Sequence, residues 1–141
     1  MALLRRLNMA ASLYDFNIEQ GSSFRMTVVY KDANNNPVDI RNWCARIIWK
    51  TNTNTTQTFS STNSDASLYK VTVVNDTSGT IKFELPASVT NAYDFNNAKY
   101  DFELESDDDH YTGGGKYVIR ILYGTITLLK RNSKSSTLLS C

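Results

Sequence analysis

Apolar and polar residues alternate with a period of two over most of the chain, which is the pattern of half-buried β-strands. In the clearest run, Ile81, Phe83 and Leu85 alternate with Lys82 and Glu84. The same alternation recurs in residues 24–31, 44–50, 68–74 and 100–105. Because successive side chains of a strand point to opposite faces, one face of each segment is predicted to be buried. The residues predicted to face a common core are Ile47, Trp49, Val71, Val73, Ile81, Phe83, Leu85, Tyr100, Phe102 and Leu104.

Residues 117–129 differ because apolar side chains occupy both phases of the alternation. This segment is predicted to be a central strand, or a strand kinked at Gly124. Residues 51–67 are polar and of low complexity, which predicts an edge strand with a mobile polar loop. Helix is indicated only in residues 86–98, where Pro86 can begin a short turn.

Turn-forming residues separate these segments at residues 32–37, 76–79 and 107–115. Seven or eight strands joined by such turns, with at most one short helical turn, are typical of an antiparallel β-sandwich. The sequence therefore predicts an all-β, immunoglobulin-like sandwich. The Cys…Trp…Cys pattern of antibody domains is absent, since Trp43 and Trp49 flank Cys44 and the second cysteine is Cys141.

A length of 141 residues fits one domain with one core. We expect a sandwich over residues 12–130, an N-terminal arm over residues 1–11 and a C-terminal arm over residues 131–141. No apolar run approaches the roughly 18 residues of a membrane-spanning helix. Arg5 and Arg6 interrupt the stretch where the apolar part of a secretory signal would lie, so we expect no export signal.

Fifteen basic and 14 acidic side chains leave a formal charge of +1, which gives no general attraction to nucleic acid or anionic lipid. The charges are unevenly distributed, with net values of +3 for residues 1–50, −7 for residues 51–109 and +5 for residues 110–141. Two interpretations are open. Basic and acidic patches can favour ordered association with charged neighbours, or strands from the three segments can interleave and average the charges out.

Candidate chemistry is sparse. The single histidine, His110, lies beside Asp109 in a predicted loop, and no Ser or Cys lies in a nucleophile motif such as G-x-S-x-G. Three consecutive carboxylates begin at Asp107, but an EF-hand count from there puts Thr112 at the required glycine and Val118 at the terminal glutamate. Two cysteines and one histidine cannot supply four zinc ligands. We therefore predict no catalytic, cofactor-binding or metal site.

Nucleic acid and small molecules are not expected partners either. Residues 113–116 lack the spacing of a phosphate-binding loop and lead into a strand. The 16 aromatic residues alternate mostly at strand period, so most are expected in the core or, for Tyr, at its rim, rather than on a base-stacking surface.

Five strings occur in order along the chain: IEQGSSF at 18–24, KDANNNPVDIRNWCAR at 31–46, GTIKFEL at 79–85, YDFEL at 100–104 and GTITL at 124–128. Together they resemble the immunoglobulin-like modules of tailed-bacteriophage virion proteins, found in baseplate, neck and decoration proteins and including the N-terminal domain of upper-baseplate proteins. In two departures, Asn36 replaces the usual glycine before Pro37 and Asn42 replaces the glycine before the aromatic residue. Asparagine tolerates left-handed backbone at modest cost, so both are acceptable.

The resemblance implies a non-enzymatic virion subunit, made in the host cytoplasm, whose partners are other virion proteins and copies of itself. The leading hypothesis is a tail, neck or baseplate adaptor. The alternatives are a capsid decoration protein and a host-surface or carbohydrate-binding module. Both arms combine leucines with basic residues, and the predicted assembly contacts are Leu3, Leu4, Arg5, Arg6, Leu7, Lys130, Arg131, Leu138 and Leu139.

Overall fold

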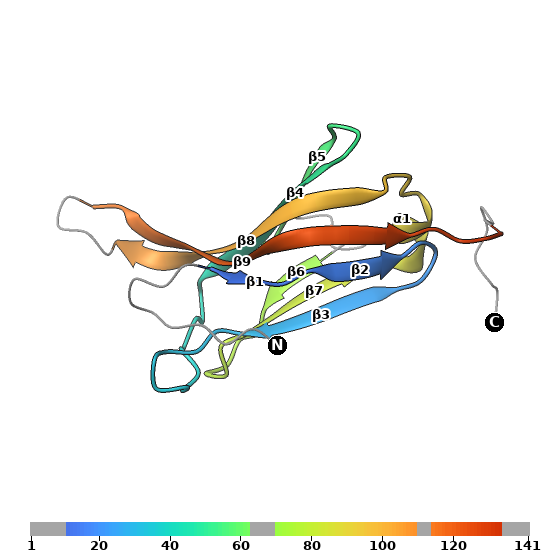
Figure 1. The fold of residues 1–141 in the computed structure, drawn as a ribbon. Helices are drawn as coiled ribbons and strands as arrows, with labels where there is room; N and C mark the ends of the chain where they lie inside the picture. Colours follow the sequence, from blue (N-terminus) through green and yellow to red (C-terminus); the bar gives the residue numbers. More distant parts are fainter. Residues whose placement is uncertain (1–10, 63–69, 110–113, 134–141) are drawn as a thin grey trace.

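The computed structural model describes residues 11–62, 70–109 and 114–133. Within these residues, nine strands form two sheets that pack face to face, and there is one short helix (Figure 1). The elements are β1 (Ser12–Leu13), β2 (Phe16–Glu19), β3 (Phe24–Val29), β4 (Cys44–Thr51), β5 (Thr56–Ser60), β6 (Lys70–Val73), β7 (Thr80–Leu85), α1 (Ala87–Asn91), β8 (Asn97–Asp109) and β9 (Lys116–Leu129).

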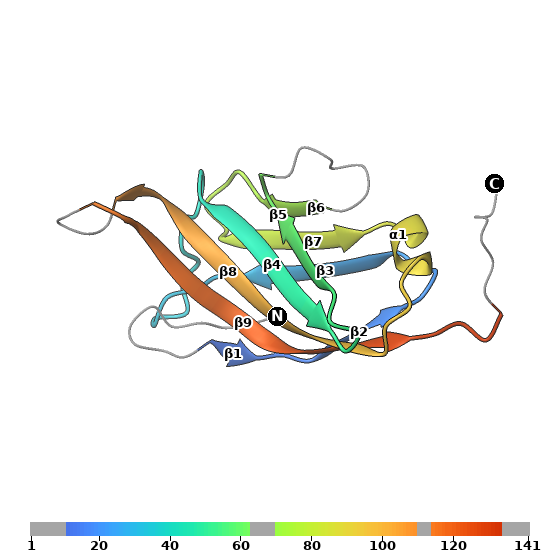
Figure 2. The ribbon, with the colours of Figure 1, turned by 90° about the horizontal axis from the view of Figure 1, so that it is seen from above.

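The large sheet has the order β1-β9-β8-β4-β5, and β2 also pairs with β9. Its strands β5, β4, β8 and β9 are antiparallel neighbours, whereas β1 and β2 run parallel to β9. The small sheet is the antiparallel set β3-β7-β6. Seen from above, the large sheet's strands run obliquely over those of the small sheet (Figure 2). The strands β3, β7 and β6 thus take the places of immunoglobulin strands B, E and D, and β4, β8 and β9 those of C, F and G. The predicted immunoglobulin-like sandwich is confirmed.

Trp49 of β4 occupies the centre of the core between the two sheets, with none of its surface exposed. Its ring centroid lies 4.6 Å from that of Phe59 and 6.1 Å from that of Phe83. Of the predicted core residues, all are buried except Val73, which is partly buried against the core. A buried tryptophan on this strand is an immunoglobulin feature, although here aromatic packing replaces the antibody disulfide and Cys44 is a free thiol.

A β-bulge explains why apolar residues occupy both the odd-numbered and the even-numbered positions of β9. The pairing with β8 jumps from Phe102↔Leu122 to Glu103↔Arg120, which leaves Ile121 as an extra residue in a β-bulge. Ile121 and Leu122 are therefore both buried, and the inward-facing positions change from odd to even numbers there. β9 is central, as predicted, because it lies between β8 and the β1 and β2 strands.

The bulge that changes the buried phase lies at Ile121, not at Gly124, the position of the alternative kink. Gly124 has a different role, since a Cβ atom there would lie only 2.5 Å from the carbonyl oxygen of Tyr14. Glycine therefore allows the chain between β1 and β2 to cross close to β9. The hydroxyl of Tyr100 donates a hydrogen bond to the same Tyr14 carbonyl.

Of the two asparagines that replace glycines of the resembled pattern, only Asn42 has the left-handed backbone that was expected. Asn42 has a left-handed φ of 68°, as expected for a residue in the place of a glycine. In the first turn, however, Asn35 has the left-handed φ of 65°, and Asn36 does not. The carboxylate of Asp32 accepts hydrogen bonds from the backbone N–H groups of Asn34 and Asn36, which sets this turn.

The predicted edge strand and short helical turn are both found, and α1 is shorter than the predicted range because β8 begins at Asn97. β5 lies at the edge of the large sheet, and the part of the predicted loop from residue 63 onward is outside the described residues. Helix α1 begins directly after Pro86, and the buried hydroxyl of Thr90 donates to the carbonyl of Ser22 over 2.8 Å. Among the described residues, no helix combines the length and hydropathy of a membrane span.

Truncating Phe83 tests the predicted core. Its ring is fully buried against Phe24, Trp49 and Phe59, so Phe83→Ala is expected to lower the free energy of unfolding by about 3–5 kcal/mol. Urea denaturation measures this loss. Thr27→Ala, on the exposed face of the neighbouring strand β3, is the control and should change stability by about 0.5 kcal/mol or less. Equal effects of the two substitutions would contradict the assigned core.

Candidate functional site

The residues considered for catalysis or metal binding do not form a site in the described chain. Strand β8 continues to Asp109, whose backbone pairs with Lys116, so the turn expected to begin at Asp107 begins later. Pairing with β9 extends the strand through these carboxylates. Asp107 is exposed, whereas His110 and the side chains of Asp108 and Asp109 lie outside the described residues. Within the described ranges, no group of three or more His, Cys, Asp or Glu side chains is placed to hold a metal.

Seven of the nine predicted assembly contacts lie outside the described residues: Leu3, Leu4, Arg5, Arg6, Leu7, Leu138 and Leu139. The other two contact their own sandwich. The ammonium of Lys130 lies 3.5 Å from the carboxylate of Asp94, and both side chains are exposed. The backbone N–H of Arg131 donates to the side-chain oxygen of Gln20 over 3.0 Å. The ordered contacts of the sandwich thus extend to Arg131, the first residue of the predicted C-terminal arm.

Gln20 joins three parts of the chain at one end of the sandwich. It is 4% exposed, and its amide nitrogen donates to the carbonyl of Tyr93 over 2.6 Å while its oxygen accepts from Arg131. The adjacent Gly21 has a φ of 82°, and a Cβ atom there would lie 2.6 Å from the Arg131 side chain. The string IEQG is therefore a structural junction.

Sequence reasoning missed this role of Gln20. A signal was present, because Gln20 continues the alternation of Phe16 and Ile18, which are both buried. A polar residue in the core-facing phase must find hydrogen-bond partners, since an unsatisfied buried amide is costly.

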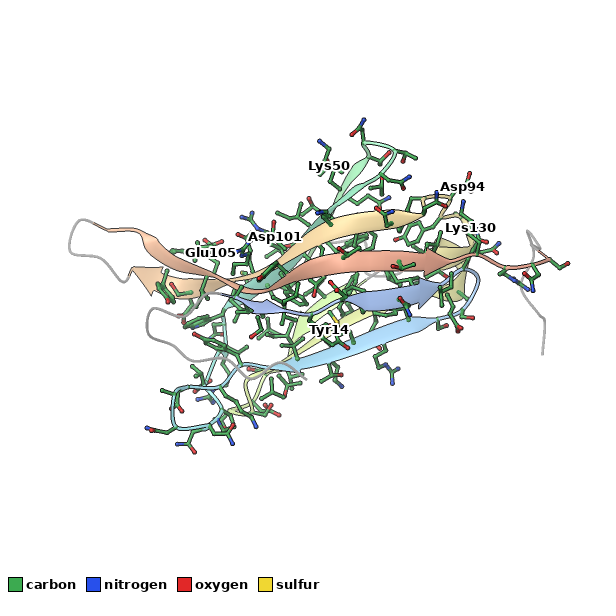
Figure 3. The ribbon with its side chains drawn as sticks, in the orientation of Figure 1. Tyr14, Lys50, Asp94, Asp101, Glu105 and Lys130 are labelled. Carbon is green, nitrogen blue, oxygen red and sulfur yellow. The ribbon has the colours of Figure 1, made fainter. Side chains whose placement is uncertain are left out.

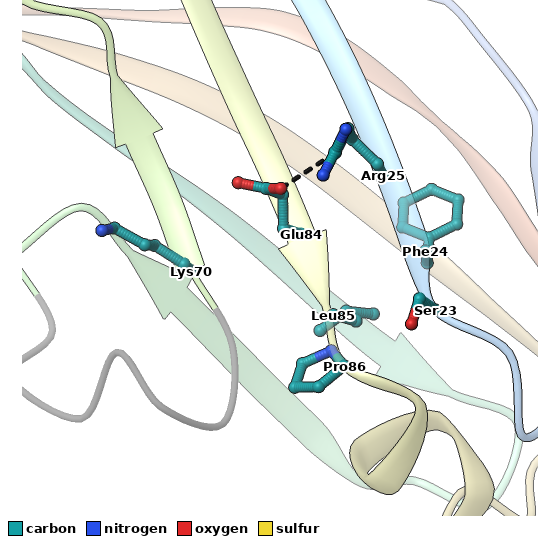
Figure 4. A pocket seen from close by; sticks show the side chains of 7 residues that line it. All are labelled: Ser23, Phe24, Arg25, Lys70, Glu84, Leu85 and Pro86. Atoms are coloured by element: carbon teal, nitrogen blue, oxygen red, sulfur yellow. Dashed lines mark hydrogen bonds and ion pairs between the residues drawn. The ribbon is translucent and has the colours of Figure 1, made fainter. Parts of the chain in front are cut away.

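An open depression of about 420 Å³ lies over one end of the small sheet (Figure 4). In it, the carboxylate of Glu84 lies 2.9 Å from the guanidinium of Arg25, and Lys70 stands opposite Glu84 on β6. One carboxylate between two cations leaves an excess of one positive charge. Exposed pairs of this kind contribute little energy, so the depression is a weak candidate for anion binding.

The outer face of the large sheet, the one turned away from the core, is the stronger candidate. One cross-strand row, which we call the central row, passes over five strands and consists of Thr58, Ile48, Asp101, Tyr123 and Leu13. Ile48 and Tyr123 are half-buried, and Leu13 is 63% exposed. Figure 3 shows Asp101 on this face between Lys50 and Glu105. The sheet thus presents apolar and aromatic surface on its solvent side.

The charged residues nearest the central row are paired with one another. Arg120 lies 2.9 Å from the carboxylate of Asp101, and its guanidinium lies 4.7 Å from the centre of the Tyr123 ring. Arg46 lies 2.8 Å from the carboxylate of Glu103. These contacts hold Arg120 against the aromatic ring and neutralise the middle of the face.

The two ends of the outer face carry opposite charges. Lys50 and Lys99 stand directly opposite each other on β4 and β8, toward α1, and form a basic end. Glu105 and Asp107, further along β8, form an acidic end. All four side chains are exposed, and none has an ion pair among the described residues. Directly opposed like charges destabilise a sheet, so the Lys50–Lys99 arrangement has a cost within the isolated chain.

The groups with shifted pKa values include Asp39 and Asp76, which lie outside the strands, and Tyr100, which is buried on β8. Hydrogen bonds from Arg41 lower the pKa of Asp39, and hydrogen bonds from Ser78 lower the pKa of Asp76. Burial is the main cause of the raised pKa of Tyr100, and the nearby charges of Tyr14, Asp15 and Asp101 add to it. These shifts follow from turn geometry and burial. They do not place an acid and a base together for proton transfer.

The comparisons with known proteins indicate no function for the chain. No protein-family model and no curated protein sequence matches the chain. Among solved structures, one similar chain comes from the ZIG-8–RIG-5 IG1–IG1 heterodimer, at 12% sequence identity and a TM-score of 0.39, over 89% of each chain. The assignment of the immunoglobulin-like sandwich therefore depends on the strand order given above.

Two truncated chains test the Gln20 junction. A chain ending at Lys130 leaves the buried oxygen of Gln20 without its donor, whereas a chain ending at Asn132 retains it. The shorter chain is expected to be less stable than the longer one by about 1–3 kcal/mol, the cost of an unsatisfied buried polar group. Thermal and urea unfolding measure the difference. Equal stabilities would show that the hydrogen bond from Arg131 contributes nothing.

Proposed function

We propose that this protein is a non-enzymatic structural subunit of a tailed-bacteriophage virion, acting as an adaptor in the tail, neck or baseplate. The observation that carries the assembly role is the outer face of the large sheet, where Ile48, Tyr123 and Leu13 of the central row lie between oppositely charged ends. Such a surface is suited to a protein partner because apolar area contributes binding energy while complementary charges orient the partner. The resemblance of the five strings to phage modules supports the virion context.

The two flanking segments join the sandwich at points far enough apart to allow contacts with more than one neighbour. Ser12 pairs with Leu122, whereas β9 ends at Leu129, seven residues further along the same strand. At about 3.3 Å per residue, the two junctions are about 23 Å apart. The sandwich is therefore joined to its flanking residues at well-separated points, which suits a subunit that links two neighbours.

The alternatives differ in their support. A carbohydrate-binding module would use exposed aromatic rings, but Trp49 is fully buried and Trp43 packs against the core. The two tryptophans therefore do not form an exposed stacking surface. A capsid decoration protein would use the same kind of surface as a tail adaptor, and the number of copies per particle distinguishes the two.

Copy number in purified particles tests the proposed function. Quantitative mass spectrometry of phage particles purified from a producing culture is expected to find the chain at six or twelve copies per particle, because tail and neck assemblies repeat with that symmetry. Immunogold labelling should place it away from the capsid surface. Hundreds of copies would indicate a decoration protein, and absence from the particles would contradict a virion role.

Substitutions in residues 1–11 test the predicted assembly contacts. Leu3→Asp, Leu4→Asp and Leu7→Asp together should leave the sandwich folded but reduce incorporation into particles, because each leucine buried at a contact contributes about 1.5–3 kcal/mol. Circular dichroism checks the fold, and immunoblots of purified particles measure incorporation. Replacing the same leucines by Met is the control and should preserve incorporation. Normal incorporation of the Asp variant would contradict the role of these residues.

A further inference from the structure

We propose that the outer face of the large sheet is the surface through which two copies of this chain pair. The inference rests on the proposed assembly role and names a second copy as the partner. It is carried by the central row, by the fixed Arg120–Tyr123 pair and by the opposite charges at the two ends of the face.

The central row supplies the apolar middle of the contact. Leu13 is 63% exposed and lies beside Tyr123. Ile48 lies in the same row, two strands from Tyr123. Arg120 is held by both Asp101 and the Tyr123 ring before any partner arrives. Tyrosine and arginine are the residue types that most often dominate binding energy, and a side chain already held in place loses little entropy on binding.

The charged ends cannot neutralise each other within one chain. Lys99 and Glu105 are six residues apart on β8, which corresponds to about 20 Å along the strand. This separation exceeds the Debye length of about 8 Å at physiological salt, so the ends interact weakly with each other. Lys116 pairs with Asp109 in the backbone register, at the same end of the β8–β9 pair as Glu105 and Asp107, so it is not part of the basic end.

In a second copy turned end for end, each charged end of one copy lies against the oppositely charged end of the other. A two-fold axis in the plane of the contact, crossing the strands between Asp101 and Glu103, brings the basic end of each copy onto the acidic end of the other. Because both copies use the same patch, the contact between a basic and an acidic end forms twice in the dimer. It also relieves the repulsion between Lys50 and Lys99, since each lysine gains a carboxylate partner.

The size of the face sets the expected strength of pairing. The four spacings of about 4.8 Å between five strands, over the nine residues from Lys99 to Asp107, give at most about 500 Å² on each copy, since β1 contributes only two residues. The total of about 1,000 Å² lies at the lower limit for specific interfaces. Pairing is therefore expected to be weak in dilute solution, sensitive to salt and favoured by the high local concentration in an assembling particle.

Charge reversal at each end of the face tests the proposal. In sedimentation velocity, the purified full chain should form a dimer as its concentration rises at low salt, and less dimer at high salt. The variant Lys50→Glu with Lys99→Glu should associate at least about tenfold more weakly than the unaltered chain, and so should Glu105→Lys with Asp107→Lys. An equimolar mixture of the two variants should restore the dimer, because the ends of one are then acidic and those of the other basic.

A matched control separates this surface from a general charge effect. Lys70→Glu with Lys82→Glu makes the same change in charge on the exposed face of the small sheet and should leave association unchanged. Circular dichroism and thermal unfolding confirm that all variants are folded. Restoration in the mixture further shows that each variant keeps a competent surface.

Several results would overturn pairing through this face. These are a monomeric chain at every concentration, an equal loss in the small-sheet control, and a mixture that does not restore the dimer. A monomeric chain that is nevertheless present in particles would refute self-pairing and leave the virion role standing. A chain that pairs as expected but is absent from particles would refute the virion role and leave the pairing surface standing.

Discussion

The extra residue at Ile121 in β9 determines how both faces of the large sheet are built. Without it, one phase of β9 would face the core along its whole length, and Arg120 and Tyr123, three positions apart, would point to opposite sides. The bulge buries Ile121 and Leu122 in succession and brings Arg120 over the Tyr123 ring on the outer face. One local irregularity therefore completes the core and also creates the centre of the candidate interaction surface.

The sandwich between these faces is held together by two different means. Around Trp49, aromatic rings from both sheets pack where an antibody domain has a disulfide, so stability comes from buried apolar area. At the end near α1, stability depends on hydrogen bonds, because Gln20 and Thr90 connect the turn after β2 to the helix and to Arg131. This arrangement extends the folded unit to residue 131.

An immunoglobulin-like sandwich serves many unrelated functions, so the fold does not select one. The proposed assembly role depends on the set of outward-facing residues, which a fold alone does not specify. Ile48 and Leu13 place apolar surface on the solvent side, and Lys50 opposite Lys99 accepts a repulsion that an isolated domain gains nothing from. A second molecule that covers the face would bury the apolar surface and offset the repulsion between the lysines.

The sequence by itself determined which residues are buried within each regularly alternating strand, because alternation with a period of two is a property of the local backbone. The core from Ile47 to Leu104 was predictable for this reason. The short helix was predictable from Pro86, and the edge position of β5 from the polar composition of residues 51–67. Only the tertiary structure decided the bulge at Ile121, the partners of Gln20 and the row from Thr58 to Leu13. Each of these depends on which distant strands become neighbours: the partners of Gln20 are 73 and 111 residues away along the chain. A periodic pattern carries no information about such pairings, since it describes the direction of each side chain but not the strand that lies beside it.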